Sequence, residues 1–186
     1  MATNEEHFLT RWELEASTHE VFDLVADAAS LPRWWPAVFL DARALEPGDA
    51  HGVGRVVEVR TKAFLPLTLT WRFRVTGAMR PTQIAVETSG DLAGIGAWFF
   101  DPAGKRVVVR FHFWGHVERP LARALPTVSR PLFAASHRWA MERGFTSLLL
   151  EVWRRRTTNE EARAWLPRPP GPTFPHNLRR WWAGAP

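Results

Sequence analysis

The sequence lacks cysteine and tyrosine altogether, although it runs to 186 residues. Without cysteine there can be no disulfide bond, no catalytic thiolate and no cysteine-ligated zinc, and without tyrosine no phenol can donate a proton. No stretch approaches the roughly eighteen consecutive apolar residues of a membrane-spanning helix. The first residues, MATNEEHF, have neither a basic start nor an apolar run, so no signal peptide is expected. These absences predict a cytoplasmic protein with no membrane span.

Lysine is scarce as well, since 22 arginines stand against 2 lysines in a chain of formal net charge +5. A basic balance can indicate a nucleic-acid partner or an anionic membrane surface. Here, however, the arginines alternate with apolar residues along predicted strands, and the run of three is confined to Arg154–Arg156. This alternation is typical of the solvated outer face of a sheet, and we expect no nucleic-acid partner.

Apolar residues are abundant: they make up 46% of the chain, which contains 11 tryptophans and 12 phenylalanines. A chain of this size forms one domain with a sizeable core, which we place at residues 1–156. Residues 157–186 contain 6 prolines and 3 tryptophans, and only Glu160–Leu166 can form a short helix. We interpret this segment as an extended tail that wraps the domain or binds a partner.

The longest predicted element is a helix over residues 131–156. Pro131 suits its first turn, Ser129 is available as the N-cap, and Arg154–Arg156 complement its carbonyl end. The residues of one face recur at steps of three or four, which places them on a common stripe: Phe133, His137, Met141, Gly144, Leu148 and Val152.

A second stripe on the same helix lies where the predicted sheet cannot cover it, and it consists of Leu132, Trp139, Leu150 and Trp153. Two partners would bury this stripe equally well. One is Trp181-Trp182 of the tail, and the other is a second copy of the chain. A homodimer through this stripe or through the tail is therefore one expectation.

Most of the remaining sequence alternates between apolar and polar residues. In Leu67–Thr76, for example, Trp71 and Phe73 face one way while Arg72 and Arg74 face the other, as in an antiparallel sheet covered on one side. Segments of this kind are Phe8–Ala16, Val38–Leu45, Gly54–Lys62, Leu67–Thr76, Gln83–Ser89, Gly94–Asp101 and Arg106–Val117.

Two short helices follow the first strand. Ser17 and Glu20 fit a capping box that opens a helix to about Ala29, and Leu31–Pro36 forms a further helical turn. We therefore predict an α+β helix-grip fold, in which a curved antiparallel sheet of about seven strands wraps around the long C-terminal helix.

Five stretches between Phe8 and about Arg156 match a known family in order and spacing: Leu31–Pro36, Gly52–Arg55, Thr61–Leu69, Ser89–Trp98 and Ser136–Met141. On these stretches the chain resembles the SRPBCC or START-like superfamily, within its branch of polyketide cyclase/dehydrase and lipid-transport proteins. Ser136 and Arg138 depart from the pattern, because similar sequences often have asparagine and an acidic residue there. The resemblance implies a cavity between sheet and long helix that takes up an apolar or amphipathic small molecule, and no cofactor is expected.

The walls of that cavity follow from strand parity and from the helical stripe. We expect ligand contacts from Trp34 and Trp35 at the mouth, from Val59, Trp71, Phe73, Thr88, Trp98, Phe100, Val109 and Phe111 on the sheet, and from Phe133, His137, Met141 and Phe145 on the helix. Any one of these side chains can instead fill the core. Together, so many rings beneath a single helix favour an apolar pocket with few polar groups.

His137 is the titratable side chain on the inward stripe of the helix. A histidine there can shuttle a proton or bind a ligand carbonyl, which makes His137 the catalytic candidate if the protein is an enzyme. The alternative is a histidine hydrogen-bonded to a neighbouring strand. Glu58 and Arg60 would form a buried ion pair if their side of the strand pointed inward. No metal site is expected, because no two histidines lie four apart on the long helix.

Three functions are compatible with these features. The leading hypothesis is a protein that binds or transfers a hydrophobic or amphipathic small molecule such as a lipid, a polyketide or an aromatic compound. The second is an enzyme of the polyketide cyclase/dehydratase kind, with His137 as acid–base. The third is an interaction module that uses its tail to bind a partner.

Overall fold

The computed structural model describes residues 6–64, 67–118 and 126–173, and within them a single antiparallel sheet holds seven strands in the order β1-β7-β6-β5-β4-β3-β2. The first strand therefore pairs with the last, and the others form a meander. The elements in chain order are β1 (Glu6–Leu14), α1 (Thr18–Ala26), η1 (Ala28–Ser30), α2 (Leu31–Trp34), β2 (Phe39–Glu46), β3 (Val56–Lys62), β4 (Thr68–Met79), β5 (Gln83–Gly90), β6 (Leu92–Ala103), β7 (Arg106–Val117), α4 (Pro126–Arg156) and α5 (Glu160–Ala164).

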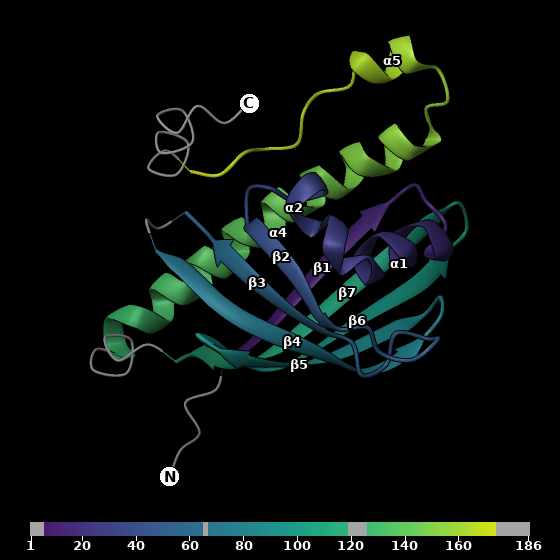
Figure 1. The fold of residues 1–186 in the computed structure, drawn as a ribbon. Coiled ribbons are helices and arrows are strands. Elements are labelled where there is room, and N and C mark those ends of the chain that lie inside the picture. Colours follow the sequence, from purple (N-terminus) through teal and green to yellow (C-terminus); the bar gives the residue numbers. More distant parts are fainter. Residues whose placement is uncertain (1–5, 65–66, 119–125, 174–186) are drawn as a thin grey trace.

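The sheet curves around α4, and α1 and α2 lie against the same face (Figure 1). This arrangement confirms the predicted helix-grip fold, with two short α-helices after the first strand and a long helix near the end. Strand parity is confirmed as well: along β4, Trp71, Phe73 and Val75 are more buried than the exposed Arg72 and Arg74 between them. Apolar side chains thus point toward the helices, and charged ones point away.

The start of α1 is fixed by the predicted capping box. The Ser17 hydroxyl accepts a hydrogen bond from the Glu20 backbone N–H at 3.2 Å, and the Ser17 backbone N–H donates to the Glu20 carboxylate at 2.8 Å. The same carboxylate accepts two hydrogen bonds from Arg156, at 2.7 and 2.9 Å. Arg156 accordingly lowers the pKa of Glu20 to about 2. These bonds tie the first helix to the end of α4.

A second connection joins α2 to the middle of α4. The indole of Trp35 lies directly on Gly144, where any side chain would collide with its six-membered ring. Beside it, Arg33 donates to Glu151 at 2.9 Å, and the Glu151 carboxylate also binds Arg154 and Arg155 although it is only 2% exposed. Glycine at position 144 is therefore explained by the close approach of a ring rather than by backbone strain.

The long helix begins earlier than predicted, at Pro126 instead of residue 131. Ser129 consequently lies within the helix and is not its N-cap. Proline suits a first turn because it has no N–H to leave unpaired, so Pro126 is as good a start as Pro131. Pro131 removes one backbone hydrogen bond without ending the helix.

After α4 the described part of the tail turns back along that helix, on the side away from the sheet (Figure 1). Arg154 donates to the Pro167 carbonyl at 3.0 Å, and Arg163 donates to the Thr157 carbonyl at 2.7 Å. Farther along, the Thr173 hydroxyl lies 3.4 Å from the Ala63 carbonyl, beyond β3. The tail up to residue 173 thus contacts its own domain. The prediction for Trp181-Trp182 falls outside the described residues.

The second stripe of α4 is only partly open. Leu150 is 8% exposed, whereas Trp153 is 51% exposed, and the Trp139 ring lies beneath the Arg143 guanidinium at 5.6 Å. Leu132 is 38% exposed as well, so two of the four side chains are open, and a homodimer through this stripe stays a prediction. Within the described segments, no helix combines the length and the apolar character needed to cross a membrane.

Candidate functional site

The concave face of the sheet is covered unevenly. Where α1 packs on β6, burial is complete: Phe100 meets the Phe22 ring at 5.6 Å and is 1% exposed. Elsewhere the inward side chains are apolar and pack against the core, yet remain half-buried: Trp71, Phe73, Val75, Val86, Trp98 and Phe111. A solidly packed interior would close such positions to solvent. We call these six residues the inward apolar surface.

The uneven cover follows from the position of α4, whose closest strand is β1. Phe8 of β1 meets the Phe133 ring edge-on at 5.2 Å and stacks on His137 at 4.6 Å. Trp12 of the same strand lies 6.0 Å from Phe145. The helix thus lies toward the β1–β7 side, and the inward residues of β4 and β5 have less of it above them.

Small residues let the rings of this surface approach one another. The Trp98 and Phe111 rings stack at 4.1 Å across β6 and β7. A Cβ at Gly96 would come within 3.1 Å of both the Phe111 ring and the Val86 side chain. At Gly96 a neighbouring ring and the Val86 side chain fill the space that a side chain would otherwise occupy.

His137 lies beside the inward apolar surface, on α4. Its ring stacks on Phe8 and lies 6.4 Å from the rings of Phe111 and Phe113. Burial among these rings lowers the pKa of His137 to about 4. The predicted hydrogen bond from His137 to a strand is not present among the described residues. At neutral pH the imidazole is therefore uncharged, able to accept one hydrogen bond and to donate one, but not to act as a cationic acid.

Trp34 and Trp35 are not at a mouth. They are 1% and 5% exposed, and their rings stack at 5.5 Å inside the core, where Trp35 also meets Phe39 at 5.2 Å. The short helix α2 turns both indoles inward because Gly144 leaves room for one of them. Sequence parity could not show this, since a four-residue helix has no periodicity to read.

The other predicted contacts divide into two groups. One group is half-buried and so partly open to solvent: Trp71, Phe73, Trp98, Phe111, Phe133, His137 and Phe145. Fully buried, and so part of the packed core, are Val59, Thr88, Phe100, Val109 and Met141. Contact with a ligand stays a prediction for both groups, and the first group is better placed to make it.

Few polar atoms interrupt this surface. The Trp71 indole N–H donates to the Thr61 hydroxyl at 2.8 Å, and the Thr88 hydroxyl lies 3.3 Å from the Gly94 carbonyl. Glu58 and Arg60 do not point inward: Glu58 binds Arg43 and Arg72 on the outer face, each at 2.8 Å. In the described residues no group of acidic, histidine or cysteine side chains could hold a metal ion.

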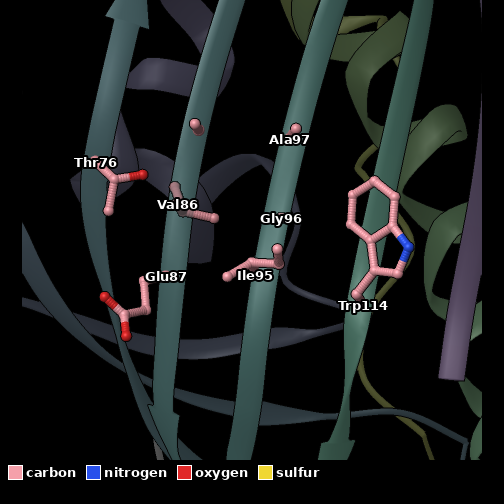
Figure 2. Close-up of a pocket in the computed structure, with 8 residues that line it drawn as sticks. Thr76, Val86, Glu87, Ile95, Gly96, Ala97 and Trp114 are labelled. Atoms are coloured by element: carbon pink, nitrogen blue, oxygen red, sulfur yellow. The ribbon is translucent and has the colours of Figure 1, made fainter. Parts of the chain in front are cut away.

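On the opposite, convex face there is a shallow hollow of about 240 Å³ (Figure 2). Thr76 and Glu87 lie along one side of it and Trp114 along the other, with Ile95 and Ala97 between them. Alternation along the strands predicted a solvated outer face, so this hollow was not predicted. The small side chains Ala85 and Ala97, which pair across β5 and β6, were the available signal.

These features define a helix-grip protein whose concave face is apolar and incompletely covered. Residues 7–167 match the family described as polyketide cyclase / dehydrase and lipid transport. Because the match spans most of the chain, the protein belongs to that family. The resemblance seen in the sequence is thereby confirmed.

Solved structures share the fold at low sequence identity. The ZhuI aromatase/cyclase from Streptomyces sp. R1128 has a TM-score of 0.69 and 17% identity, over 83% of this chain and 97% of that one. A START superfamily protein from Mycobacterium smegmatis has a TM-score of 0.64 and 15% identity, over 80% and 98%. Norcoclaurine synthase from Thalictrum flavum has a TM-score of 0.55 and 16% identity, over 82% and 97%. No curated protein matches the sequence significantly.

Proposed function

We propose that the protein binds a hydrophobic or amphipathic small molecule, such as a lipid, a polyketide or an aromatic compound, between α4 and the inner face of β4–β7. The observation that supports this most directly is the half-burial of the inward apolar surface. These rings are already partly buried, so a ligand covers only the part of each ring that is still exposed, and each Å² of apolar area removed from water contributes roughly 25 cal/mol. A ligand that completes the burial of Trp71, Phe73 and Phe111 gains that free energy.

The ligand is apolar at the end that enters. The residues it meets are aromatic and aliphatic, and the nearby indole and hydroxyl groups of Trp71 and Thr61 already satisfy each other. His137 is uncharged at neutral pH because burial lowers its pKa to about 4. One hydrogen bond from a ligand carbonyl or hydroxyl to this imidazole would fix its orientation. Transfer between membranes and storage are both compatible with such a site.

Catalysis is the second candidate, supported by the presence of an imidazole beside the inward apolar surface and by the family's polyketide cyclases. A neutral His137 would act as a hydrogen-bond partner or a weak general base. It would be protonated only in acid solution, so a cyclase that used it as a cationic acid at neutral pH would need the ligand to raise its pKa. His137→Gln, which keeps a hydrogen-bonding group, separates orientation from proton transfer.

The binding test uses N-phenyl-1-naphthylamine, a neutral fluorescent probe that brightens in apolar sites. Val86→Phe fills the inner side of β5, and Ala85→Phe places the same ring on the outer side of the neighbouring residue. We expect Val86→Phe to weaken probe binding about tenfold, which is about 1.4 kcal/mol, and Ala85→Phe to leave it within about twofold of the wild type. Native mass spectrometry of protein purified from its own host should show the bound molecule.

Two results would contradict the proposal. One is probe binding that Ala85→Phe abolishes and Val86→Phe spares, since that would place the site on the convex face. The other is a wild-type protein that neither binds the probe nor retains any molecule through purification. Circular dichroism of both variants confirms that the fold is unchanged.

A further inference from the structure

The described part of the tail crosses the back of α4 and ends on the sheet. Residues 167–173, which we call the strap, follow α5 and run along α4 on the side away from the sheet (Figure 1). At the start of the strap, Arg154 of α4 donates to the Pro167 carbonyl at 3.0 Å. At its end, the Thr173 hydroxyl lies 3.4 Å from the carbonyl of Ala63, the residue after β3. The strap therefore joins the C-terminal end of α4 to the end of β3.

The end of the strap lies close to the inward apolar surface. Ala63 is two residues beyond Thr61, which is about 7 Å along an extended chain. The Thr61 hydroxyl accepts a hydrogen bond from the Trp71 indole at 2.8 Å, and Trp71 and Phe73 belong to that surface. Both rings are only half-buried, since α4 packs on β1 at the far edge of the sheet. A molecule that reaches Trp71 past the end of β3 must therefore pass the strap.

Two elements of the described chain close the side of the site between α4 and β2–β3. One is α2, whose neighbour Trp35 meets Phe39 of β2 at 5.2 Å and lies on Gly144 of α4. Trp35 is 5% exposed. The other is the strap, in which every residue before Pro172 is exposed or half-buried. Segments with little buried surface open at the lowest cost in free energy. The strap, rather than α2, is therefore the part of this side that can move.

The composition of the strap suits a segment that lifts as a unit. Four of its seven residues are proline: Pro167, Pro169, Pro170 and Pro172. Proline has no backbone N–H, so the strap cannot extend the hydrogen-bond ladder of the sheet. A proline-rich chain is also a stiff, extended spacer, which loses little conformational entropy when it docks. The strap can consequently leave β3 by giving up the contacts at its end, without breaking any strand pairing.

We propose that the strap is the gate of the ligand site. While its end is docked beside Ala63 it blocks the path to Trp71, and a ligand enters or leaves when this end lifts. The inference rests on the proposed function, since it requires a ligand that binds between α4 and the sheet. A gate of this kind changes the barrier to exchange and not the bound state. It controls the rates of binding and release and leaves the equilibrium affinity almost unchanged.

Cross-linking the end of the strap tests this. The native chain contains no cysteine, so Ala63→Cys/Thr173→Cys carries a single pair of thiols, which mild oxidation joins. Stopped-flow mixing with N-phenyl-1-naphthylamine compares the oxidised and reduced forms of this one protein. We expect the disulfide to slow association and dissociation at least about tenfold and to leave Kd within about twofold, and we expect reduction to restore both rates. Each single-cysteine variant, treated with the same oxidant, is the matched control and should exchange the probe like the wild type.

A second variant should move the rates in the opposite direction. Pro172→Gly removes the buried ring and the stiffness at the end of the strap, so both rates should rise at least about threefold. A wild type that does not bind the probe would overturn the proposed function and this inference with it. Probe binding whose rates change with neither the disulfide nor Pro172→Gly would overturn the gate alone, because the strap would then only stabilise the domain. Failure of the two cysteines to join would overturn it as well, since the end of the strap would not dock beside Ala63.

Discussion

Replacing Gly144 by alanine should destabilise the protein, although the same change in an exposed helix would stabilise it. Alanine has a helix propensity about 1 kcal/mol more favourable than glycine. At Gly144, however, the added Cβ would lie 2.6 Å from Cε2 and 2.8 Å from Cη2 of Trp35. Trp35 is 5% exposed and in contact with Trp12, Trp34 and Phe39, so its ring has no free space to enter.

Overpacking of this kind costs about 1–3 kcal/mol, and more where the neighbours are rigid. Subtracting the propensity gain of about 1 kcal/mol, we expect Gly144→Ala to lower the free energy of unfolding by up to about 2 kcal/mol. In a chain of this length each kcal/mol corresponds to a fall of about 2–4 °C in Tm. Urea unfolding followed by tryptophan fluorescence and by circular dichroism measures it, and coincident curves establish two-state behaviour.

A double-mutant cycle identifies the ring as the cause. Trp35→Phe removes the outer atoms of the indole and is itself destabilising because it leaves a cavity. In that background Gly144→Ala should cost nothing or stabilise, which gives a coupling free energy of about 1 kcal/mol or more. The reasoning would be refuted if Gly144→Ala raised the Tm of the wild type, or if its cost were the same with Phe at position 35.

Three further outcomes are expected. Glu151→Gln should lower the free energy of unfolding by about 1–3 kcal/mol in urea titrations, because it weakens three charge-assisted contacts to a carboxylate that is 2% exposed; an unchanged midpoint would contradict this. In the unfolded protein His137 is protonated below pH about 6.5, but in the folded protein it is protonated only below about 4. The free energy of unfolding should therefore fall by up to about 3 kcal/mol as the pH is lowered through that interval. His137→Phe should flatten this part of the pH profile. Arg156→Gln should raise the pKa of Glu20, which is about 2 in the wild type. The loss of stability as the pH falls from about 4.5 to 2 should then disappear. NMR titration of the Glu20 carboxyl carbon measures this pKa directly.

The sequence was sufficient wherever the decisive interaction is local. The alternation in Leu67–Thr76 revealed which side of β4 is buried, because successive side chains of a strand point to opposite faces. The serine and glutamate at positions 17 and 20 revealed the start of α1, because a capping box closes within one helical turn. The start of α4 was placed too late, since either Pro126 or Pro131 can occupy a first turn.

The sequence could not show how the helices and strands pack against one another. The packing of α4 against β1 leaves Trp71 and Phe73 half-buried, whereas Phe100 is fully buried. Only the space over Gly144 turns Trp35 into the core. These depend on contacts between residues far apart in the chain, and no local pattern encodes them.

The convex face of the sheet shows the same division most clearly. In β1 and β7 the outward Leu9 and Trp114 each lie between polar residues of the same face, so each strand by itself is typical of a solvated face. The antiparallel register sets Ile95 beside Trp114 and Trp114 beside His7, and so gathers single apolar residues into one surface. The sequence determined which residues face outward, because side chains alternate between the two faces with a two-residue period. Only the tertiary structure decided which of these residues lie side by side, because the register between two strands depends on both strands and on their packing.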